Sequence, residues 1–319
     1  MKFLFLLSGE AIELAKAEVL SLFKIERHIS IGRYLFLNTN RMPQSLIYRL
    51  AYTKKVYKML FICKDSEIES RMNSFNWKSI YKNNFCLRLH AYNNVLSFGA
   101  DKLAGYVWRA VLQPKVCLES PNTMIEIFFI NGMAYCGLAL YNQTEEFEQR
   151  KAHKRPALHP VSLHPKLARC LVNLSGARKG EIIVEPFCGI GGIMIEAWMI
   201  GCRTIGYDID KVILAKCRKN LDYFGIKGYN LINSDATKIK RKHNYIVTDL
   251  PYGKSTVIPK NLYLNFLITL KKILCRRAVV VFPDFVDYKR LIRKANLKIL
   301  GEYSYYIHKS MTKRIVVLC

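Results

Sequence analysis

The sequence predicts an α/β protein in which two small α+β units precede a larger, doubly wound sheet that is mostly parallel and ends in an antiparallel hairpin. Three observations support this prediction. The chain has 319 residues, enough for about two or three domains. From residue 166 onward, short apolar runs alternate with segments of helical periodicity. A polar segment, predicted as a linker over residues 144–165, contains three prolines and separates this part from the residues before it.

The first predicted unit spans residues 1–60. Its opening strand at Leu4–Leu7 ends at Ser8-Gly9-Glu10, too early for the apolar segment of a signal peptide. Apolar residues recur at helical spacing over Glu10–Phe23, alternate as in a strand over Ile29–Asn38, and return to helical spacing over Gln44–Phe61.

The second predicted unit spans residues 61–143. It contains strands at Phe85–His90 and Val116–Leu118 on either side of a helix at Leu96–Leu112. The strands Met124–Phe129 and Met133–Leu140 are predicted to form a hairpin, because Asn131-Gly132 between them suits a tight turn.

The third predicted unit, residues 166–319, alternates helices and strands to its end. The helices are Leu167–Leu174, Gly192–Ile200, Lys211–Phe224, Leu262–Leu274 and Asp284–Ala295; the strands are Ile182–Val184, Thr204–Tyr207, Leu231–Ile232, Tyr245–Thr248 and Ala278–Phe282. Lys298–Ile307 and Arg314–Leu318 then form the antiparallel hairpin. Because helical crossovers make the other strands parallel, we expect their carboxyl ends to meet at one edge of the sheet.

The charge balance favours a polyanionic partner over a general lysine bias. Lys and Arg number 50 against 24 Asp and Glu, a net charge of +26, and most of the excess lies after residue 150. The linker cations Arg150, Lys151, Lys154 and Arg155 are predicted to contact an RNA backbone. The cysteines and histidines show no metal-ligand spacing and no segment is apolar enough to span a membrane, so we expect a reduced, cytoplasmic protein without structural metal.

A glycine-rich turn follows the first strand of the third unit. In Glu185-Pro186-Phe187-Cys188-Gly189-Ile190-Gly191-Gly192, the glycines let backbone approach a ligand and the helix start offers free N–H groups. The glycine spacing differs from the dinucleotide pattern Gly-x-Gly-x-x-Gly. The acid at position 185 suits a ligand with a free amino group better than a pyrophosphate.

Acidic residues also follow the next two strands. Asp208 is placed to accept hydrogen bonds from two ribose hydroxyls, and Asp235 from an adenine amino group. Asp210 is predicted instead to cap the helix that begins at Lys211. Together these acids predict a nucleoside-containing cofactor at the carboxyl edge of the sheet.

The sharpest motif is Asp249-Leu250-Pro251-Tyr252-Gly253, after the strand Tyr245–Thr248. A base's exocyclic amine is a poor nucleophile because its lone pair is delocalised into the ring. The Asp249 carboxylate and the Leu250 carbonyl can accept its two hydrogens and make the lone pair more available. Pro251 restricts the turn, Tyr252 can stack on a base withdrawn from its helix, and Gly253 leaves space.

These motifs, in this order, resemble those of S-adenosylmethionine-dependent amino-methyltransferases, and most closely the archaeal tRNA guanine-N2 methyltransferases that modify guanosine-10. His159-Pro160, Pro165–Arg169 and Leu171–Leu174 resemble the helix before the family's first catalytic strand, and Val116, Leu118 and Pro121 resemble the THUMP pattern. The resemblance implies a ferredoxin-like domain at 1–60, a THUMP domain at 61–143, and a Rossmann-like class I methyltransferase domain at 166–319.

The resemblance also implies S-adenosyl-L-methionine as cofactor, tRNA as partner, and direct in-line methyl transfer. The implied cofactor-binding residues are Glu185, Phe187, Gly189 and Gly191 for the methionine part, Asp208 for the ribose, Asp235 for the adenine, and Asp249; the implied catalytic residues are Asp249, Leu250, Pro251 and Tyr252. Leu250 replaces the proline of the wider Asp-Pro-Pro-Tyr pattern, and mono- and dimethylation both stay open.

Three other functions compete with this one. A methyltransferase acting on another RNA or DNA amine would share the motifs. A nicotinamide-dependent oxidoreductase would share the sheet, but the glycine spacing argues against it. A non-catalytic RNA-binding protein would not need the acids at 185, 208, 235 and 249. We expect a monomer without membrane contact, and an accessory subunit stays open.

Overall fold

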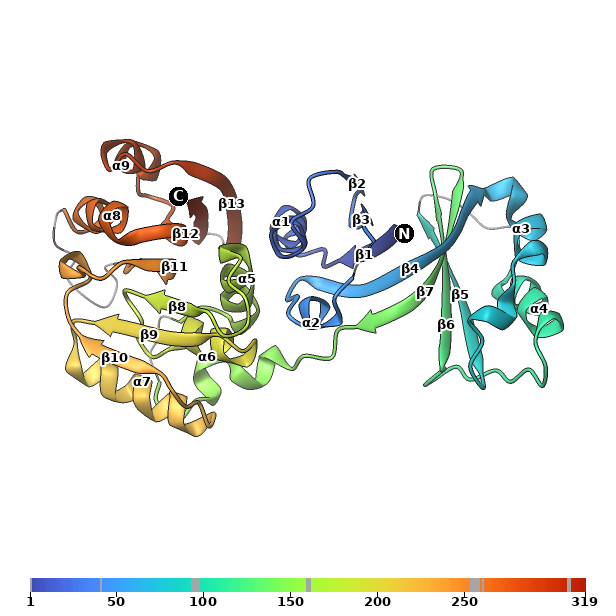
Figure 1. Ribbon diagram of the computed structural model, residues 1–319, viewed down its shortest axis with the longest axis horizontal. Helices are drawn as coiled ribbons and strands as arrows, with labels where there is room; N and C mark the ends of the chain where they lie inside the picture. The colour runs from blue at the N-terminus through green and yellow to red at the C-terminus, as the bar shows by residue number, and fades with distance from the viewer. Residues whose placement is uncertain are drawn as a thin grey trace. The chain divides into compact units, whose positions relative to one another are not determined.

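The computed structural model describes residues 2–40, 42–92, 98–158, 162–252, 259, 261–308 and 311–319. Leu96, His159, Pro160 and Gly253, on which sequence predictions fall, lie outside these residues. The chain forms two compact units, the first from Met1–Leu7, Arg27–Tyr48 and Thr53–Gln143 and the second from Ser8–Glu26, Arg49–Tyr52 and Thr144–Cys319. Each unit is built on one seven-stranded sheet (Figure 1).

The sheet of the first unit has the strand order β2-β3-β1-β4-β7-β6-β5. Its strands are β1 (Lys2–Leu7), β2 (His28–Ile31), β3 (Tyr34–Asn38), β4 (Thr53–Lys64), β5 (Phe85–Tyr92), β6 (Thr123–Ile130) and β7 (Met133–Asn142). The helices are α2 (Gln44–Ile47), α3 (Ile68–Ser74) and α4 (Ala100–Ala110), with short 3-10 turns η1 (Asp65–Glu67) and η2 (Trp77–Ser79). Buried Trp77 lies in the core between α3, α4 and the sheet. The hairpin predicted around Asn131-Gly132 is present as β6 and β7.

The helix predicted over Gln44–Phe61 is wrong. Helix α2 ends at Ile47, and β4 then pairs with both β1 and β7 in the middle of the sheet. Val56 and Tyr57 are both buried at a shift in the register against β7, and the partly exposed Leu60 and Ile62 are apolar too, so the sequence lacks the alternation that marks a strand. The predicted boundary at residue 60 falls inside this strand.

Two smaller predictions for the first unit also need correction. Ile29–Asn38 folds as two strands, β2 and β3, joined at Gly32, whose φ of +53° favours glycine. Val116 makes an isolated bridge with Phe85, and Val116–Leu118 is not a strand.

The sheet of the second unit has the order β10-β9-β8-β11-β12-β14-β13. Its strands are β8 (Ile182–Glu185), β9 (Arg203–Asp208), β10 (Asn230–Asn233), β11 (His243–Asp249), β12 (Leu274–Pro283), β13 (Ile299–His308) and β14 (Met311–Leu318). The first five pair in parallel and the last two antiparallel. This confirms the predicted parallel sheet with a terminal antiparallel hairpin.

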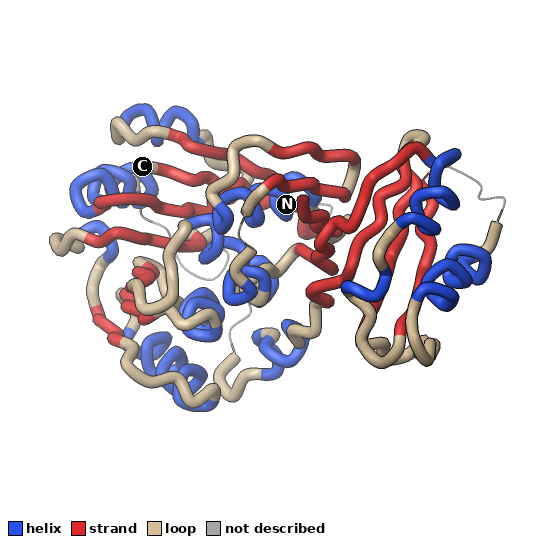
Figure 2. Tube along the Cα trace, turned by 45° about the vertical axis from the view of Figure 1, so that its right-hand side comes forward, coloured by secondary structure: helices blue, strands red, loops and turns tan. Residues whose placement is uncertain are grey.

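Helices cover the second sheet, as Figure 2 shows in blue beside the red strands. They are α1 (Ile12–Phe23), α5 (Pro165–Ser175), α6 (Gly192–Met199), α7 (Lys211–Tyr223), α8 (Leu262–Ile273) and α9 (Tyr288–Lys294), with 3-10 turns η3 (Phe147–Arg150), η4 (Ala152–Lys154) and η5 (Ala236–Lys238). None of the helices in the described part of the chain is long and apolar enough to cross a bilayer.

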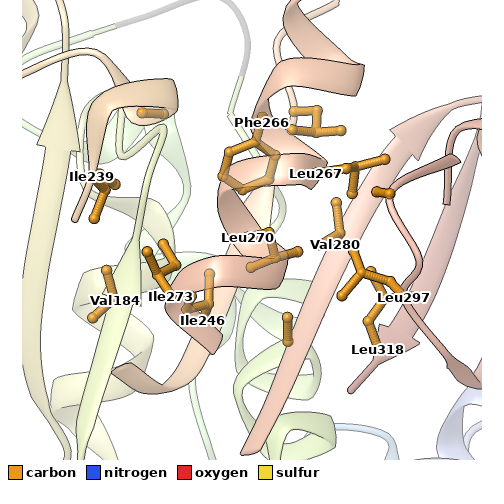
Figure 3. Packing of buried hydrophobic residues seen from close by; sticks show 14 of the residues in the cluster. Val184, Ile239, Ile246, Phe266, Leu267, Leu270, Ile273, Val280, Leu297 and Leu318 are labelled. Atoms are coloured by element: carbon orange, nitrogen blue, oxygen red, sulfur yellow. The ribbon is translucent and has the colours of Figure 1, made fainter. Parts of the chain in front are cut away.

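The main core of the second unit lies between the sheet and α8. Phe266, Leu267 and Leu270 of α8 pack on Val184, Ile246, Val280 and Leu318 from four strands (Figure 3). Leu250, just past the end of β11, is fully buried in the same cluster. Burial of its side chain therefore anchors the turn that carries the sharpest sequence motif.

Part of the role predicted for residues 144–165, contact of their cations with an RNA backbone, is wrong. Arg150 and Arg155 are buried, with 8% and 3% of their surface exposed, so they do not face an RNA backbone. The Arg150 Nε lies 2.6 Å from Glu196 Oε1, and the Arg169 guanidinium 2.8 Å from Glu196 Oε2. Because Glu196 is itself fully buried, it requires such cationic partners.

Candidate active site at the carboxyl edge of the parallel sheet

The turn between β8 and α6 depends on two glycines with left-handed backbone. Gly189 has φ of +51° and Gly191 has φ of +85°. A Cβ on Gly191 would also lie 2.9 Å from Cys217 Sγ, whereas a Cβ on Gly189 would meet no heavy atom within 4 Å. Gly191 therefore permits helix packing, and Gly189 borders open space where a ligand can approach.

Glu185 ends β8 and is only 4% exposed. Its carboxylate accepts a hydrogen bond from the backbone N–H of Met194 in α6, while its Oε2 has no partner among the described residues. Burial, with Cys217 and Asp249 nearby, raises the pKa of Glu185 well above its ordinary value. A buried polar atom without a partner is a position where a bound ligand or a water molecule can supply the missing hydrogen bond.

Asp208 is the last residue of β9, and its carboxylate links the loops after β8 and β9 by hydrogen bonds. Its Oδ2 accepts a hydrogen bond from the Gly189 N–H at 3.0 Å, and its Oδ1 accepts one from the Asp210 N–H at 3.0 Å. Asp210 accepts from the N–H groups of Val212 and Ile213, which confirms its predicted role as the cap of α7. Carboxylate oxygens accept hydrogen bonds from hydroxyl groups, so the type of group at this position suits a ligand with hydroxyls.

Asp235 lies one strand further along the same edge, just after β10. Its Oδ1 accepts hydrogen bonds from the backbone N–H and the hydroxyl of Thr237, both at 2.8 Å, and so caps η5. Phe187 is partly buried and packs against the core, with its ring centroid 5.0 Å from that of Phe266. The predicted cofactor residues thus occupy consecutive loops after β8, β9 and β10.

Asp249 is the last residue of β11 and forms a partly buried ion pair that sequence reasoning missed. Lys313 of β14 places its Nζ 2.8 Å from Asp249 Oδ2 and 3.0 Å from Oδ1, and the Tyr252 hydroxyl donates to Oδ1 at 3.0 Å. The same Nζ lies 4.1 Å from the centroid of the Tyr252 ring. Burial raises the pKa of Asp249, and the Lys313 ammonium opposes that rise.

Backbone hydrogen bonds fix the turn after Asp249. The Leu250 N–H donates to the Val281 carbonyl at 3.0 Å, extending the ladder between β11 and β12. The Tyr263 hydroxyl of α8 donates to the Pro251 carbonyl at 2.7 Å. A proline at position 250 would lack the first of these donors, so leucine here holds the turn in a different way from the wider motif.

The edge of the sheet therefore combines two kinds of chemistry. The loops after β8, β9 and β10 present hydrogen-bond acceptors suited to hydroxyl, amino and ammonium groups. The end of β11 presents a partly buried carboxylate next to an aromatic ring and a lysine. The loops after β8, β9 and β10 can hold a nucleoside-like group, and the turn after β11 can orient an amine.

Comparison with known proteins finds that the chain is similar to methyltransferases. The model of the family UPF0020, described as RMKL-like, methyltransferase domain, matches residues 152–313. The chain is 33% identical over 335 residues to tRNA (guanine(10)-N2)-dimethyltransferase of Methanothermobacter thermautotrophicus, covering 100% of this chain and 99% of that protein.

Solved structures share the fold. TrmN from Thermus thermophilus aligns with a TM-score of 0.55 and 18% identity over 100% of this chain and 99% of its own. SMU.472, a putative methyltransferase complexed with SAH, aligns with a TM-score of 0.50 and 15% identity over 98% and 97%. Both likenesses support the arrangement of strands and helices.

Proposed function

This chain belongs to the UPF0020 family of RMKL-like methyltransferase domains, and from that premise we propose that it methylates N2 of a guanosine in tRNA with S-adenosylmethionine as donor. The observation that carries this proposal is the partly buried Asp249 carboxylate, held beside Tyr252 at the end of β11. Guanosine-10 is the proposed target, since the named relative that covers the whole chain acts there.

The residues at the sheet edge fit the proposed cofactor. The unpartnered Glu185 Oε2 suits its ammonium group, the Asp208 carboxylate suits its ribose hydroxyls, and open space at Gly189 admits it. Asp235 is proposed for the adenine amine and Phe187 and Gly191 for the walls of the same site. The cofactor supplies a sulfonium methyl group that is already activated for transfer.

The chain's own part in the reaction is to hold and orient the target amine. We propose that the Asp249 carboxylate and the Leu250 carbonyl accept hydrogen bonds from the two hydrogens of N2. Tyr252 stacks on the face of the base. Pro251 keeps Leu250 and Tyr252 on one turn, which the Tyr263 hydroxyl fixes. Most of the rate enhancement then comes from positioning, with Asp249 as the acceptor of the amine's proton.

The first unit is proposed to bind the same tRNA. Residues 61–143 would act as a THUMP domain, and the strands β1 to β3 would form a ferredoxin-like part of the same sheet. Support comes from the α+β arrangement of β4 to β7 with α3 and α4, whereas most of the positive charge lies after residue 150 and favours an RNA contact by the second unit as well.

Nucleoside mass spectrometry tests the proposed function. An unmodified tRNA transcript incubated with the protein and S-adenosylmethionine should yield N2-methyl- or N2,N2-dimethylguanosine. A transcript with inosine at position 10, which lacks only the exocyclic amine, should yield neither. Methylation of a different base would overturn the guanine assignment, and product from the inosine transcript would overturn the position.

Asp208→Ala should weaken binding of S-adenosylhomocysteine by about 10- to 100-fold, because it removes hydrogen bonds to a charged acceptor and releases the Gly189 N–H. Isothermal titration calorimetry measures this change. Asp210→Ala is the matched control: it removes the cap of α7 two residues away and should lower stability while changing affinity by less than about threefold. Equal losses of affinity in both variants would contradict the ribose assignment.

A further inference from the structure

Two buried atoms of opposite charge lack partners near the start of α6. Arg155 Nη2 and Glu185 Oε2 are both inaccessible to solvent, and neither has a hydrogen-bond partner among the residues the structure describes. The two side chains are 3% and 4% exposed. Since each unpartnered group is costly to bury, the pair indicates a ligand that carries both charges.

Both side chains reach the first turn of the same helix. A Cβ built on Gly192, the first residue of α6, would lie 3.5 Å from Arg155 Nη1 and 3.9 Å from Nη2. Glu185 contacts this turn through the N–H of Met194. No ion pair joins Arg155 to Glu185 within the described ranges, so the two charges face the helix start separately.

Among the described residues no carboxylate forms an ion pair with Arg155, which feels the charges of Glu196 and Glu185 only at longer range. Its Nε donates to the Arg150 carbonyl at 2.9 Å, and its Nη1 lies 3.5 Å from Ser162 Oγ. The nearby carboxylate of Glu196 is already bonded by Arg150 and Arg169. A guanidinium held in place by its Nε while Nη2 remains unpaired is suited to receive a carboxylate.

We propose that Arg155 and Glu185 together bind the amino-acid end of the cofactor, with Arg155 holding the α-carboxylate and Glu185 the α-ammonium group. This inference rests on the proposed function and adds a residue that sequence reasoning had placed on an RNA-facing surface. It explains both unpartnered atoms with one zwitterionic ligand. It is also consistent with glycine at the first position of the helix, where the guanidinium approaches.

Isothermal titration calorimetry with ligands that lack one charge tests the carboxylate contact of Arg155 and the ammonium contact of Glu185 separately. The probes are S-adenosylhomocysteine, its analogue without the carboxylate, its analogue without the amino group, and methylthioadenosine, which lacks the whole amino acid. Arg155→Gln should weaken S-adenosylhomocysteine binding by about 10- to 100-fold and leave binding of the carboxylate-free analogue unchanged. Glu185→Gln should weaken S-adenosylhomocysteine similarly and leave the amino-free analogue unchanged.

Controls separate this role from a structural one. Lys154→Gln removes an exposed cation next to Arg155 and should change no affinity. Unchanged methylthioadenosine binding shows that a variant is folded, and Arg155→Lys, which keeps the charge, should bind S-adenosylhomocysteine with intermediate affinity. Equal weakening of every ligand by Arg155→Gln, or no weakening of S-adenosylhomocysteine, would overturn the inference. Failure of the wild-type protein to bind S-adenosylhomocysteine would instead overturn the proposed function.

Discussion

Asp249→Ala should abolish methyl transfer, lowering kcat by about 10²- to 10⁴-fold, while S-adenosylhomocysteine still binds. The reason is that Asp249 is the charged acceptor at the end of β11, and alanine leaves the target amine without it. Single-turnover transfer of labelled methyl groups to tRNA measures the rate, and calorimetry measures cofactor binding. Full activity in this variant would contradict the assignment of the active site.

Two further variants make the Asp249 result interpretable. Asp249→Ala leaves Lys313 buried without its carboxylate partner, which is itself destabilising. The double variant Asp249→Ala with Lys313→Met removes both charges and should restore stability but not activity. Asp287→Ala removes an acid that only caps α9 and should retain wild-type transfer. Recovery of transfer in the double variant would show that the lost rate came from misfolding.

The acids of the site could be predicted from sequence because their positions follow from the fold. Glu185, Asp208 and Asp249 each end a parallel strand, and parallel strands in neighbouring positions present their carboxyl ends at one edge. The glycine turn was recognisable for a similar reason, since only glycine readily takes the φ values found at 189 and 191.

Lys313 and Arg155 could not be predicted in the same way. Lys313 meets Asp249 only because β14 inserts beside β12, in a register that pairs Lys313 with Pro283 while Val281 pairs with Asp249. Sequence periodicity contains no information about such cross-strand register. Arg155 lies in a basic, proline-containing segment that is typical of a solvated linker, and its burial depends on packing against α6.

The long strand β4 shows a third limit of sequence reasoning. Its burial alternates from Tyr57 to Cys63, but the partly exposed Leu60 and Ile62 are also apolar and the register against β7 shifts at Val56, so the sequence shows no polar alternation. The strands β8, β11 and β12 could be predicted, because their apolar runs are short, continuous and bounded by turns. Apolar length and boundaries were therefore more informative than periodicity for the buried strands of this chain.

Lys313→Met should lower kcat/KM at neutral pH by about 10- to 100-fold and shift the acid limb of its pH profile to higher pH. Burial raises the pKa of Asp249, and Lys313 is the first of the groups that lower it. Removing the ammonium removes that opposition, so the carboxylate form would appear only at higher pH. Since kcat/KM reports ionisations of the free enzyme, its pH profile measures this shift directly.

The pH profile also distinguishes electrostatic support from simple packing. Lys313→Arg keeps a cation beside Asp249 and should retain the wild-type acid limb even if its rate falls. Lys289→Met removes an exposed lysine paired with Glu302 and should leave both the rate and the profile unchanged. A lower rate in Lys313→Met with an unmoved acid limb would mean that Lys313 only fills space over the Tyr252 ring. A shifted limb that Lys313→Arg restores would establish that the charge of Lys313 keeps Asp249 ionised for the reaction.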